Sequence, residues 1–373
     1  MILIPTYKEA LNLTISNPEL YKVSKIEVSK GFLLHTFDYL PGSDKKNVAG
    51  LGLEMRGLSF LENQNNNTIS RYLSLRKFYN LNEREDTSLK NLKDKKINSI
   101  TLKEDGSLIS FLNINGKAIA KTRNGMKSVS TILSNKFVEE NHLNDSIIKM
   151  INKGYYPFFE ITGLDNIVVI IYPKTSLTLL QIRDKNGNYL DRKEIFKLCE
   201  EVGFPKKFIV KEFPLTSLED LHKLSKTVTN IEGWVVMFDS QNMVKIKTRW
   251  YLDEKEKLYS DNFKWKNLLE AIIYNKLDED DLESLPSYKK TFIKSMQSKI
   301  LIKFENYLEK FIEDFKEIKK NCYLSNNENQ AIRLAMHMLG CDTLLIKEFV
   351  KKEFLSMYKK ESDCRKLFMK TKD

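Results

Sequence analysis

Apolar and polar positions alternate over short stretches in the first two thirds of the chain, a pattern that predicts β-strands with one buried face. The clearest pair, residues 107–113 and 117–122, flanks Asn115-Gly116, a dipeptide that suits the type I′ turn of a hairpin. Such short connections require antiparallel pairing, so we expect antiparallel sheets. Two further hairpins are predicted in the same way, one across Asn186-Gly187 between residues 177–183 and 189–190, the other across residues 239–242 between residues 234–238 and 243–247.

Helix signals lie between these strands. Asp191 and Glu194 form a capping-box pattern at the start of a helix, and Gly203 suits its end. Further helices are predicted at residues 145–153 and from Ser217 onward. The apolar, β-branched run at residues 167–172 instead predicts a strand in the centre of a sheet.

After residue 253 the strand pattern fades and helical spacing takes over. Residues 288–320 contain neither Pro nor Gly, and their apolar positions recur at helical spacing. Helices are also predicted at residues 265–277, 327–339 and 343–358. We therefore expect two domains, residues 1–253 with mixed strands and helices and residues 254–373 with helices alone.

The composition is that of a globular protein with room for two cores. The chain has 373 residues, 42% of them hydrophobic, and no apolar run reaches the roughly 20 residues that span a bilayer. The first residues lack the charged-then-apolar pattern of a signal peptide, so we expect a cytoplasmic protein, in the host cytoplasm if it is viral, without a membrane partner. The cysteines and histidines are scattered, which argues against a zinc site.

Net charge gives a hint about the partner. Lys and Arg number 61 against 50 Asp and Glu, a formal charge of +11. This excess favours a polyanion such as nucleic acid, because neutralising phosphates releases counterions. Solvated lysine-rich surfaces would give the same excess, so charge alone does not establish such a partner.

The segment Lys103-Glu104-Asp105-Gly106 carries the most specific chemistry. A lysine amine attacks a phosphorus atom only when it is neutral, and because a free lysine has a pKa of about 10.4, its surroundings must lower that pKa. Lys245 and Lys247 are two apart on a predicted strand and share a face, where their charges would lower the pKa and cradle phosphates. An edge strand with both lysines in water is the plainer interpretation of that pair.

Two carboxylates are candidates for ligand contact. Glu160 stands between Phe159 and Ile161, where a carboxylate is costly unless it is paired or accepts hydrogen bonds, for example from ribose hydroxyls. Glu232, at the start of a predicted strand, could hold a metal ion, since hard cations prefer oxygen ligands. A structural ion pair and a surface charge would explain the same two residues without any ligand.

Three more positions could contact a nucleotide. Arg56 and Lys77 could hold phosphate or ribose, with Arg the better bidentate donor. Gly106 lets the backbone come close to a bound nucleotide. Each also has an ordinary explanation, a salt bridge for the two cations and a turn for the glycine.

Taken together, these residues resemble the nucleotidyltransferase superfamily of ATP-dependent ligases and mRNA capping enzymes, and more closely the RNA ligase 1 family of phage-type tRNA-repair ligases. The likeness covers roughly residues 30–255 and only loosely the helical C-terminal part. Residues 103–107 resemble the motif whose lysine is adenylated. Residues 53–57 and 77–83 resemble two upstream segments, and Phe159-Glu160, Glu232-Gly233 with Val235, and Lys245-Ile246-Lys247 resemble later motifs in the expected order.

The resemblance implies a fold class and a set of site residues. The fold would be α+β, an antiparallel-sheet nucleotidyltransferase domain followed by an all-α C-terminal domain. Lys103 would accept AMP from ATP, and Glu232 would serve Mg²⁺ or, alternatively, Mn²⁺. The other contacts to ATP would come from Arg56, Lys77, Gly106, Glu160, Lys245 and Lys247, with the adenine between Leu180 and Val235.

Three positions depart from the family pattern, and one acidic position matches it loosely. Arg123 falls where the family has an essential lysine, and Arg keeps the charge but not the geometry. Phe37, which the resemblance places among the cofactor-binding residues, falls where the family has a tyrosine, so any hydroxyl contact is lost. Asn166 stands where a basic residue is usual. Asp280, within the acidic residues 278–281, resembles a metal-contacting patch, although a solvated loop explains it as well.

The implied function is ATP-dependent joining of RNA 5′-phosphate and 3′-hydroxyl ends through a lysyl-AMP enzyme and an adenylylated RNA 5′ end. The expected substrate is a nicked tRNA recognised by the C-terminal domain, the ligase is expected to be a monomer, and an end-healing kinase and phosphatase would be its functional partner. One alternative is a capping enzyme or DNA ligase, which usually carries an oligonucleotide-binding barrel where this chain has helical spacing. The other is a non-catalytic RNA-binding protein on a ligase scaffold.

Overall fold

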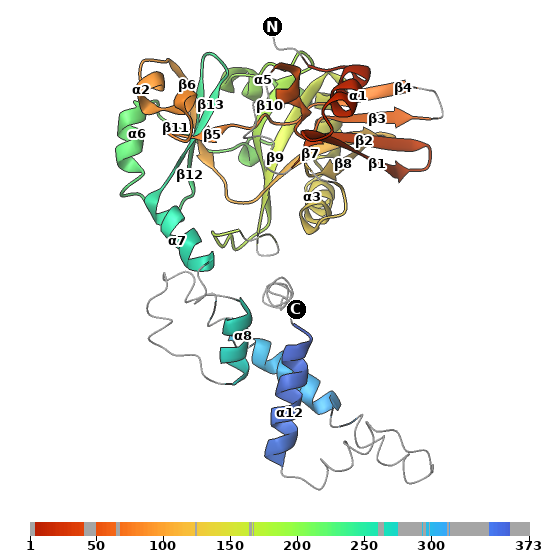
Figure 1. Ribbon diagram of the computed structural model, residues 1–373, viewed down its shortest axis with the longest axis vertical. Coiled ribbons are helices and arrows are strands. Elements are labelled where there is room, and N and C mark those ends of the chain that lie inside the picture. Colours follow the sequence, from red (N-terminus) through yellow and green to blue (C-terminus); the bar gives the residue numbers. More distant parts are fainter. Residues whose placement is uncertain are drawn as a thin grey trace. The chain divides into compact units, whose positions relative to one another are not determined.

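The computed structural model describes residues 4–40, 50–64, 68–123, 125–163, 166, 168–259, 265–274, 293, 296–297, 299–311, 313 and 343–358. The chain divides into two compact units, Met1–Asp253 and Glu254–Asp373 (Figure 1). Among the described residues, every strand belongs to the first unit. No described helix is both long and apolar enough to cross a lipid bilayer.

The first unit begins with a four-stranded antiparallel sheet in the order β1-β2-β3-β4. Helix α1 (Tyr7–Ser16) starts with a capping box between Thr6 and Glu9, and its Ala10 is buried in the core beneath this sheet. The short 3₁₀ helix η2 (Gly50–Met55) ends just before Arg56. The strands are β1 (Tyr21–Ser29), β2 (Phe32–Tyr39), β3 (Ser59–Asn63) and β4 (Thr68–Tyr72).

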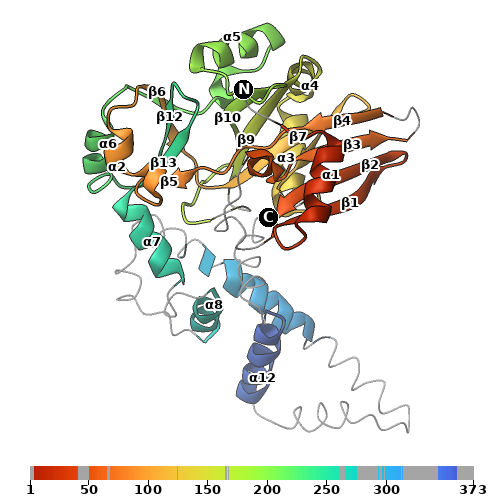
Figure 2. The ribbon, with the colours of Figure 1, turned by 45° about the horizontal axis from the view of Figure 1, so that its top comes forward.

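A second antiparallel sheet has the order β10-β9-β7-β8 and two chemically different faces. Side chains alternate along a strand, so Ile109, Phe159 and Leu179 lie on one face, in a hydrophobic core with three helices (Figure 2). Leu108 and Glu160, which are directly opposite each other, lie on the other face. The strands are β7 (Ser107–Ile114), β8 (Lys117–Lys121), β9 (Tyr155–Thr162) and β10 (Ser176–Asp184), and the helices are α3 (Val129–Glu140), α4 (Asn144–Asn152) and α5 (Arg192–Val202), followed by the 3₁₀ helix η5 (Lys206–Phe208).

The third sheet, in the order β11-β6-β12-β13-β5, is antiparallel except for the β13–β5 pair. One face buries Ile100, Trp234 and Val236 against the short helices α2 and α6. The residues between them in sequence therefore lie on the opposite face. The elements are β5 (Tyr79–Asn80), η3 (Glu85–Thr87), α2 (Leu89–Leu92), β6 (Ile97–Lys103), β11 (Glu212–Phe213), α6 (Leu218–Leu224), β12 (Gly233–Phe238) and β13 (Met243–Lys247).

The predicted hairpins and helix caps are confirmed. Asn115 and Gly116 both have positive φ, 52° and 78°, as a type I′ turn requires between β7 and β8. Residues 186–187 and 239–242 also connect antiparallel partners. Helix α5 begins with the Asp191 capping box and ends at Gly203 with φ of 76°. Local signals were sufficient here because each involves residues that are neighbours in sequence.

The predicted central strand at residues 167–172 is wrong. Its described part, residues 168–172, has bends rather than strand pairing. The carboxylate of Asp105 accepts hydrogen bonds from the backbone N–H groups of Val169 and Ile170, each at 2.7 Å. A distant side chain thus satisfies the backbone donors that a neighbouring strand would otherwise satisfy.

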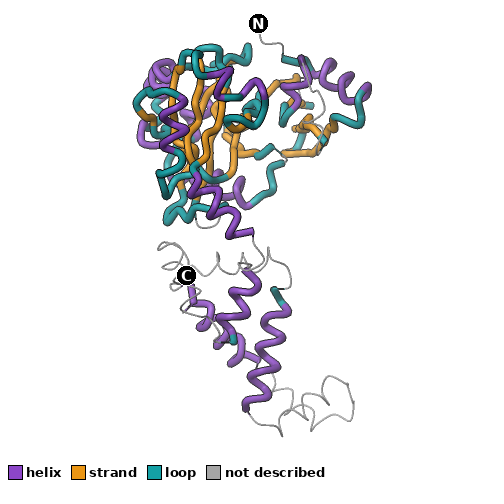
Figure 3. Tube along the Cα trace, turned by 60° about the vertical axis from the view of Figure 1, so that its left-hand side comes forward, coloured by secondary structure: helices purple, strands orange, loops and turns teal. Residues whose placement is uncertain are grey.

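All regular secondary structure that the structure describes in the second unit is helical (Figure 3). Residues 299–311 are helical, and Phe304 packs edge-on against Phe354 with ring centroids 5.3 Å apart. The predicted helix at residues 327–339 lies outside the described residues. The named helices are α7 (Arg249–Tyr259), which crosses the boundary between the units, α8 (Trp265–Ile273) and α12 (Thr343–Ser356).

We predict that Gly233→Ala destabilises the first unit. Gly233 has φ of 148°, and an added Cβ would overlap the carbonyl oxygen of Ile246 on the neighbouring strand. We expect a loss of roughly 2 kcal/mol or more in the free energy of unfolding, measured by urea denaturation. Gly203→Ala is the control, because its Cβ would meet nothing within 4 Å and only the positive φ opposes it. Equal losses in both variants would contradict the proposed overlap.

Candidate active site

A cavity of about 350 Å³ lies between the facing sides of the second and third sheets. It is lined by side chains from β6, β12 and β13 on one side and from β7, β9 and β10 on the other, and by residues 75–78. Most of the predicted site residues lie around this one cavity: Arg56, Lys77, Lys103, Gly106, Glu160, Leu180, Val235 and Lys245.

The register of three strands arranges the cavity floor in rows. Lys103 of β6 is opposite Gly233 of β12, which is opposite Lys247 of β13. Two residues further along β12, Thr101, Val235 and Lys245 form the next row, and Ser99, Met237 and Met243 form the third. The sheet therefore changes from charged to apolar along its own strands.

Glu232 joins the two lysines of the first row. Its Oε2 accepts a hydrogen bond from Lys103 Nζ at 2.8 Å, and its Oε1 lies 2.7 Å from Lys247 Nζ. Glu232 is almost fully buried, whereas about a fifth of the Lys103 side chain is exposed. Glu232 and Lys247 are not among the residues that line the cavity. Glu232, which is itself paired with Lys247, therefore holds the Lys103 amine from outside the cavity lining.

The charges around Lys103 differ from the sequence-based expectation. Burial lowers the pKa of Lys103, but the carboxylates of Glu232, Glu160 and Asp105 and the hydrogen bond to Glu232 together raise it above its ordinary value. Without a nucleotide the amine is therefore held as a cation. The depressed pKa falls on Lys245 instead, where burial, followed by the charges of Lys103 and Lys247, lowers it to about 8.

Glu160 is buried and tied to the loop that follows the lysine. Its Oε1 accepts a hydrogen bond from the backbone N–H of Gly106 at 3.1 Å. Burial raises the pKa of Glu160 to about 8, although the charge of Lys103 opposes the rise. A Cβ on Gly106 would overlap the carbonyl oxygen of Ile161, so this glycine is required by the close passage of the loop over β9.

Asp105 fixes the same loop from the other side, a role that the sequence did not reveal. Besides the two backbone donors at Val169 and Ile170, its carboxylate accepts a hydrogen bond from the Tyr251 hydroxyl at 2.8 Å. Its own N–H donates to the Tyr172 hydroxyl. The nucleophile candidate, at the end of β6, is therefore followed by a loop that residues far apart in sequence hold in place.

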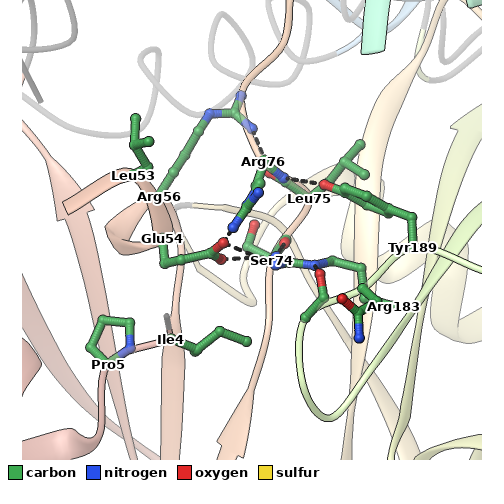
Figure 4. A network of polar contacts seen from close by, with 12 residues as sticks. Ile4, Pro5, Leu53, Glu54, Arg56, Ser74, Leu75, Arg76, Arg183 and Tyr189 are labelled. Atoms are coloured by element: carbon green, nitrogen blue, oxygen red, sulfur yellow. Dashed lines mark hydrogen bonds and ion pairs between the residues drawn. The ribbon is translucent and has the colours of Figure 1, made fainter. Parts of the chain in front are cut away.

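A buried ion-pair network anchors Arg56 (Figure 4). Glu54 accepts two hydrogen bonds of 2.9 Å from the guanidinium of Arg183 and another from Arg76. Arg183 is fully buried and also donates to the carbonyl oxygen of Ser74. Arg56, two residues after Glu54, donates to the Leu75 carbonyl oxygen at 3.2 Å. The sequence motif contained Glu54 without assigning it a role, and its partner Arg183 was missed.

Arg123 lies near Arg56 but does not line the cavity. Its Nε donates to both carboxylate oxygens of Asp38, at 2.9 and 2.7 Å. Burial, followed by the charge of Arg123, lowers the pKa of Arg56. Lys121, which is buried, donates to the Gly57 carbonyl oxygen at 3.3 Å, and burial lowers its pKa to about 8. A cation-rich group thus lies behind Arg56.

Among the described residues, Phe37 and Asn166 do not line the cavity. Phe37 is fully buried and packs edge-on against Phe60 at 5.8 Å, so it presents no surface to a ligand and is not carried into the proposed site. Asn166 bonds Ser107 and the Ile161 backbone, in the place of the basic residue usual in the family. Asp280 lies outside the described residues, and its role as a metal ligand stays a prediction.

The carboxylates present fit a metal ion that arrives with phosphates. Within the described ranges, no three or more His, Cys, Asp or Glu side chains are grouped as metal ligands. Mg²⁺ commonly uses only one or two carboxylates together with substrate phosphates and water. Glu232 and Glu160, which both act on Lys103, are the candidates for that role.

We predict that Glu160 makes the nucleotide-free protein less stable as pH rises. Because its pKa is raised in the folded state from 4.5 to about 8, it contributes stability below about pH 4.5 that is lost as pH rises towards 8. Glu160→Gln should flatten the fall in the free energy of unfolding over that range, by at most about 1.4 kcal/mol per pH unit.

The measurement is urea denaturation of wild type and variant between pH 5 and 8. Glu201→Gln is the control, because Glu201 lies at the surface and its pKa is lowered by Lys153, which moves its titration below this range. If wild type and Glu160→Gln lose stability in parallel across the range, Glu160 does not have the raised pKa.

Comparisons with known proteins match this chain to RNA ligases. A family model described as RNA ligase matches residues 54–251, more than half of the chain. A curated protein of Thermovibrio ammonificans named "Putative RNA ligase" is 29% identical over 210 residues, which cover 53% of this chain and 52% of that protein. The chain thus matches about half the length of this relative.

Two solved structures are similar to this chain at low identity. An archaeal ATP-dependent RNA ligase is 14% identical, with 93% of this chain and 78% of that chain covered and a TM-score of 0.49. A mutant Naegleria gruberi RNA ligase with ATP and Mn is 20% identical, with 49% of this chain and 58% of that chain covered and a TM-score of 0.37. Because the family model spans every motif from Glu54 to Tyr251, the chain belongs to the RNA ligase family.

Proposed function

We propose that this chain is an ATP-dependent RNA ligase that forms a covalent lysyl-AMP intermediate on Lys103. The observation that carries the proposal is the cavity itself. It combines the partly exposed side chain of Lys103 with the cations Arg56, Lys77 and Lys245 and with apolar walls at Leu180 and Val235. Such a set suits a nucleoside triphosphate, which has a flat apolar base at one end and a polyanion at the other.

The proposed orientation of ATP follows the rows of the third sheet. The base would lie between Leu180 and Val235, and Glu160 would accept hydrogen bonds from the ribose hydroxyls. The triphosphate would extend towards Lys245, whose amine stacks on the Phe78 ring, and towards Arg56 and Lys77. The α-phosphate would then come within reach of Lys103.

In the first step the Lys103 Nζ lone pair attacks the α-phosphorus, a P–N bond forms, and the bond to pyrophosphate breaks. The amine must first lose its proton, and Glu232 Oε2, at 2.8 Å, is placed to receive it. A bound Mg²⁺ or Mn²⁺, held by Glu232 and Glu160 with the phosphates, would supply charge neutralisation at the phosphorus. Lys245 adds positive charge where negative charge develops on the departing phosphates.

The later steps require an RNA with a 5′-phosphate and a 3′-hydroxyl. A 5′-phosphate oxygen of the RNA attacks the lysyl-AMP phosphorus, the P–N bond breaks, and AMP moves to the RNA end. The 3′-hydroxyl then attacks the RNA phosphorus and AMP leaves, a step that depends on positioning and charge. We propose that the substrate is a nicked tRNA, supplied by an end-healing kinase and phosphatase, and that the helical second unit selects it.

We predict that Lys103→Ala abolishes labelling by radioactive ATP and joining of 5′-phosphorylated RNA, a loss of at least about 1,000-fold. Sealing of a pre-adenylylated RNA should be partly retained, because that step needs no lysine nucleophile. The exposed Lys117 provides the control variant, Lys117→Ala, which should label normally. Labelled protein recovered from Lys103→Ala, with the adduct mapped to another residue, would sink the assignment.

We predict that removing residues 260–373 spares lysine adenylylation but weakens RNA selection. The first unit carries the whole cavity, so labelling by ATP should persist. The preference for nicked tRNA over linear RNA of equal length should fall about tenfold, equivalent to about 1.4 kcal/mol of differential binding. The measurement is the ratio of ligation rates on the two RNAs. An unchanged ratio in a truncated protein that still labels would remove the proposed role of the second unit.

A further inference from the structure

Arg192 is a cavity residue that the proposed chemistry leaves unused. It is the first residue of α5, lines the cavity, and is only 6% exposed. Its Nε lies 3.4 Å from a carboxylate oxygen of Glu212, and its Nη2 donates to the Val210 carbonyl oxygen at 3.1 Å. The third nitrogen, Nη1, has no hydrogen-bond partner among the residues that the structure describes.

A buried guanidinium nitrogen without an acceptor is unusual in a folded protein. Leaving such a donor unsatisfied costs roughly 1–3 kcal/mol, so it is retained only where something outweighs that cost. Burial lowers the pKa of Arg192 and Glu212 opposes this, but an arginine stays protonated and can only donate. The two satisfied nitrogens fix the plane of the group and hold Nη1 in place before any ligand arrives.

The neighbours of Arg192 place it on the side of the cavity where β6 and β10 meet. Glu212 is paired with Thr101 on the edge of β6, and the N–H of Val210 donates to the Leu179 carbonyl oxygen next to Leu180. Arg192 therefore lies where β6 and β10 approach each other through residues 210–212. In the third sheet, Lys245 belongs to β13, which β12 separates from β6 and its β11 edge.

This position corresponds to the edge of a base held between Leu180 and Val235. Val235 shares a row with Thr101, and Leu180 follows Leu179, so the two walls and Arg192 belong to the same level of the cavity. Gln181, another polar residue there, is already engaged, since its side chain accepts from the Ile182 N–H and donates to the Met237 sulfur. Arg192 remains as a donor without an assigned acceptor.

Resting on the proposed nucleotide function, we propose that Nη1 of Arg192 donates a hydrogen bond to a ring nitrogen of the ATP base, which makes Arg192 a base-specificity residue. The ring nitrogens N1, N3 and N7 of adenine are acceptors and fit a group that can only donate. At N1 this contact would also exclude guanine, whose N1 carries a hydrogen. A contact at N3 or N7 would favour purines over pyrimidines.

The test compares full-length wild type with Arg192→Met, which keeps the volume of the side chain but has no donor. ATP and its 1-deaza, 3-deaza and 7-deaza analogues are assayed, with dissociation constants from calorimetry and rates of Lys103 adenylylation. In wild type, one analogue should bind about tenfold more weakly than ATP. In Arg192→Met, ATP should bind more weakly by a similar factor. That analogue should then bind about as tightly as ATP.

Two further variants separate base recognition from a structural role. Lys193→Met, at the exposed next position of the same helix, should keep the wild-type pattern. Arg192→Lys keeps the charge but not the fork that fixes Nη1, and it is the variant to use if Arg192→Met does not fold. It too should reduce the difference in binding between ATP and that analogue. The proposal is overturned if folded Arg192 variants keep every wild-type difference between ATP and the analogues. A wild type that binds ATP with these differences but never labels Lys103 would instead refute only the proposed ligase chemistry.

Discussion

The pairing of β12 between β6 and β13 is the constraint on which the site depends. It places Gly233 between Lys103 and Lys247, so the preceding residue, Glu232, contacts both amines. Gly233 is needed at that point because a side chain would overlap the backbone of β13. The distance between the nucleophile candidate and its carboxylate is thus set by hydrogen bonding within a sheet, which is far stiffer than two flexible side chains on a surface. A shift in register of one residue would turn Lys103 away from the cavity.

The same rows set up an electrostatic balance that a nucleotide would change. In the protein alone, carboxylates raise the pKa of Lys103, while burial and neighbouring lysines lower the pKa of Lys245 to about 8. Phosphates beside Lys245 would favour its charged form and raise its pKa again. A cation that associates with Glu232 would weaken that residue's hold on the Lys103 proton. The resting charges therefore keep the amine of Lys103 protonated, and under the proposed mechanism it would become neutral only after the nucleotide and the metal ion have bound.

How far the sequence could predict this structure depends on how far apart the interacting residues are. The turn at Asn115-Gly116 and the cap at Asp191 depend on neighbours in the chain, and both were predicted correctly. The motif residues around Lys103 were brought to one cavity because they alternate along paired strands. Residues 168–172 are not a strand because Asp105, more than sixty positions away, binds their backbone, and an apolar run carries no trace of that contact. Phe37 was placed at the site by resemblance, but its burial depends on packing that no motif records.

Arg183 and Arg192 show how similar burial can have different consequences. Arg183 donates to Glu54, to the Ser74 carbonyl oxygen and to the Gly187 carbonyl oxygen, so all three of its nitrogens are satisfied within the protein. Removing Arg183 would take from the buried Glu54 the guanidinium that binds both of its oxygens and leave it only Arg76, so we expect the loss to weaken folding. Arg192 has two satisfied nitrogens and one that the described residues leave unsatisfied, and it borders a cavity. The sequence places Arg183 in an apolar strand and Arg192 at a capped helix start. Neither position shows which guanidinium nitrogens have an acceptor, so the sequence alone could not reveal the difference. The two arginines differ in how many of their donors the fold satisfies. Arg183, with every nitrogen bonded, stabilises the fold, whereas Arg192 keeps one donor for the proposed ligand.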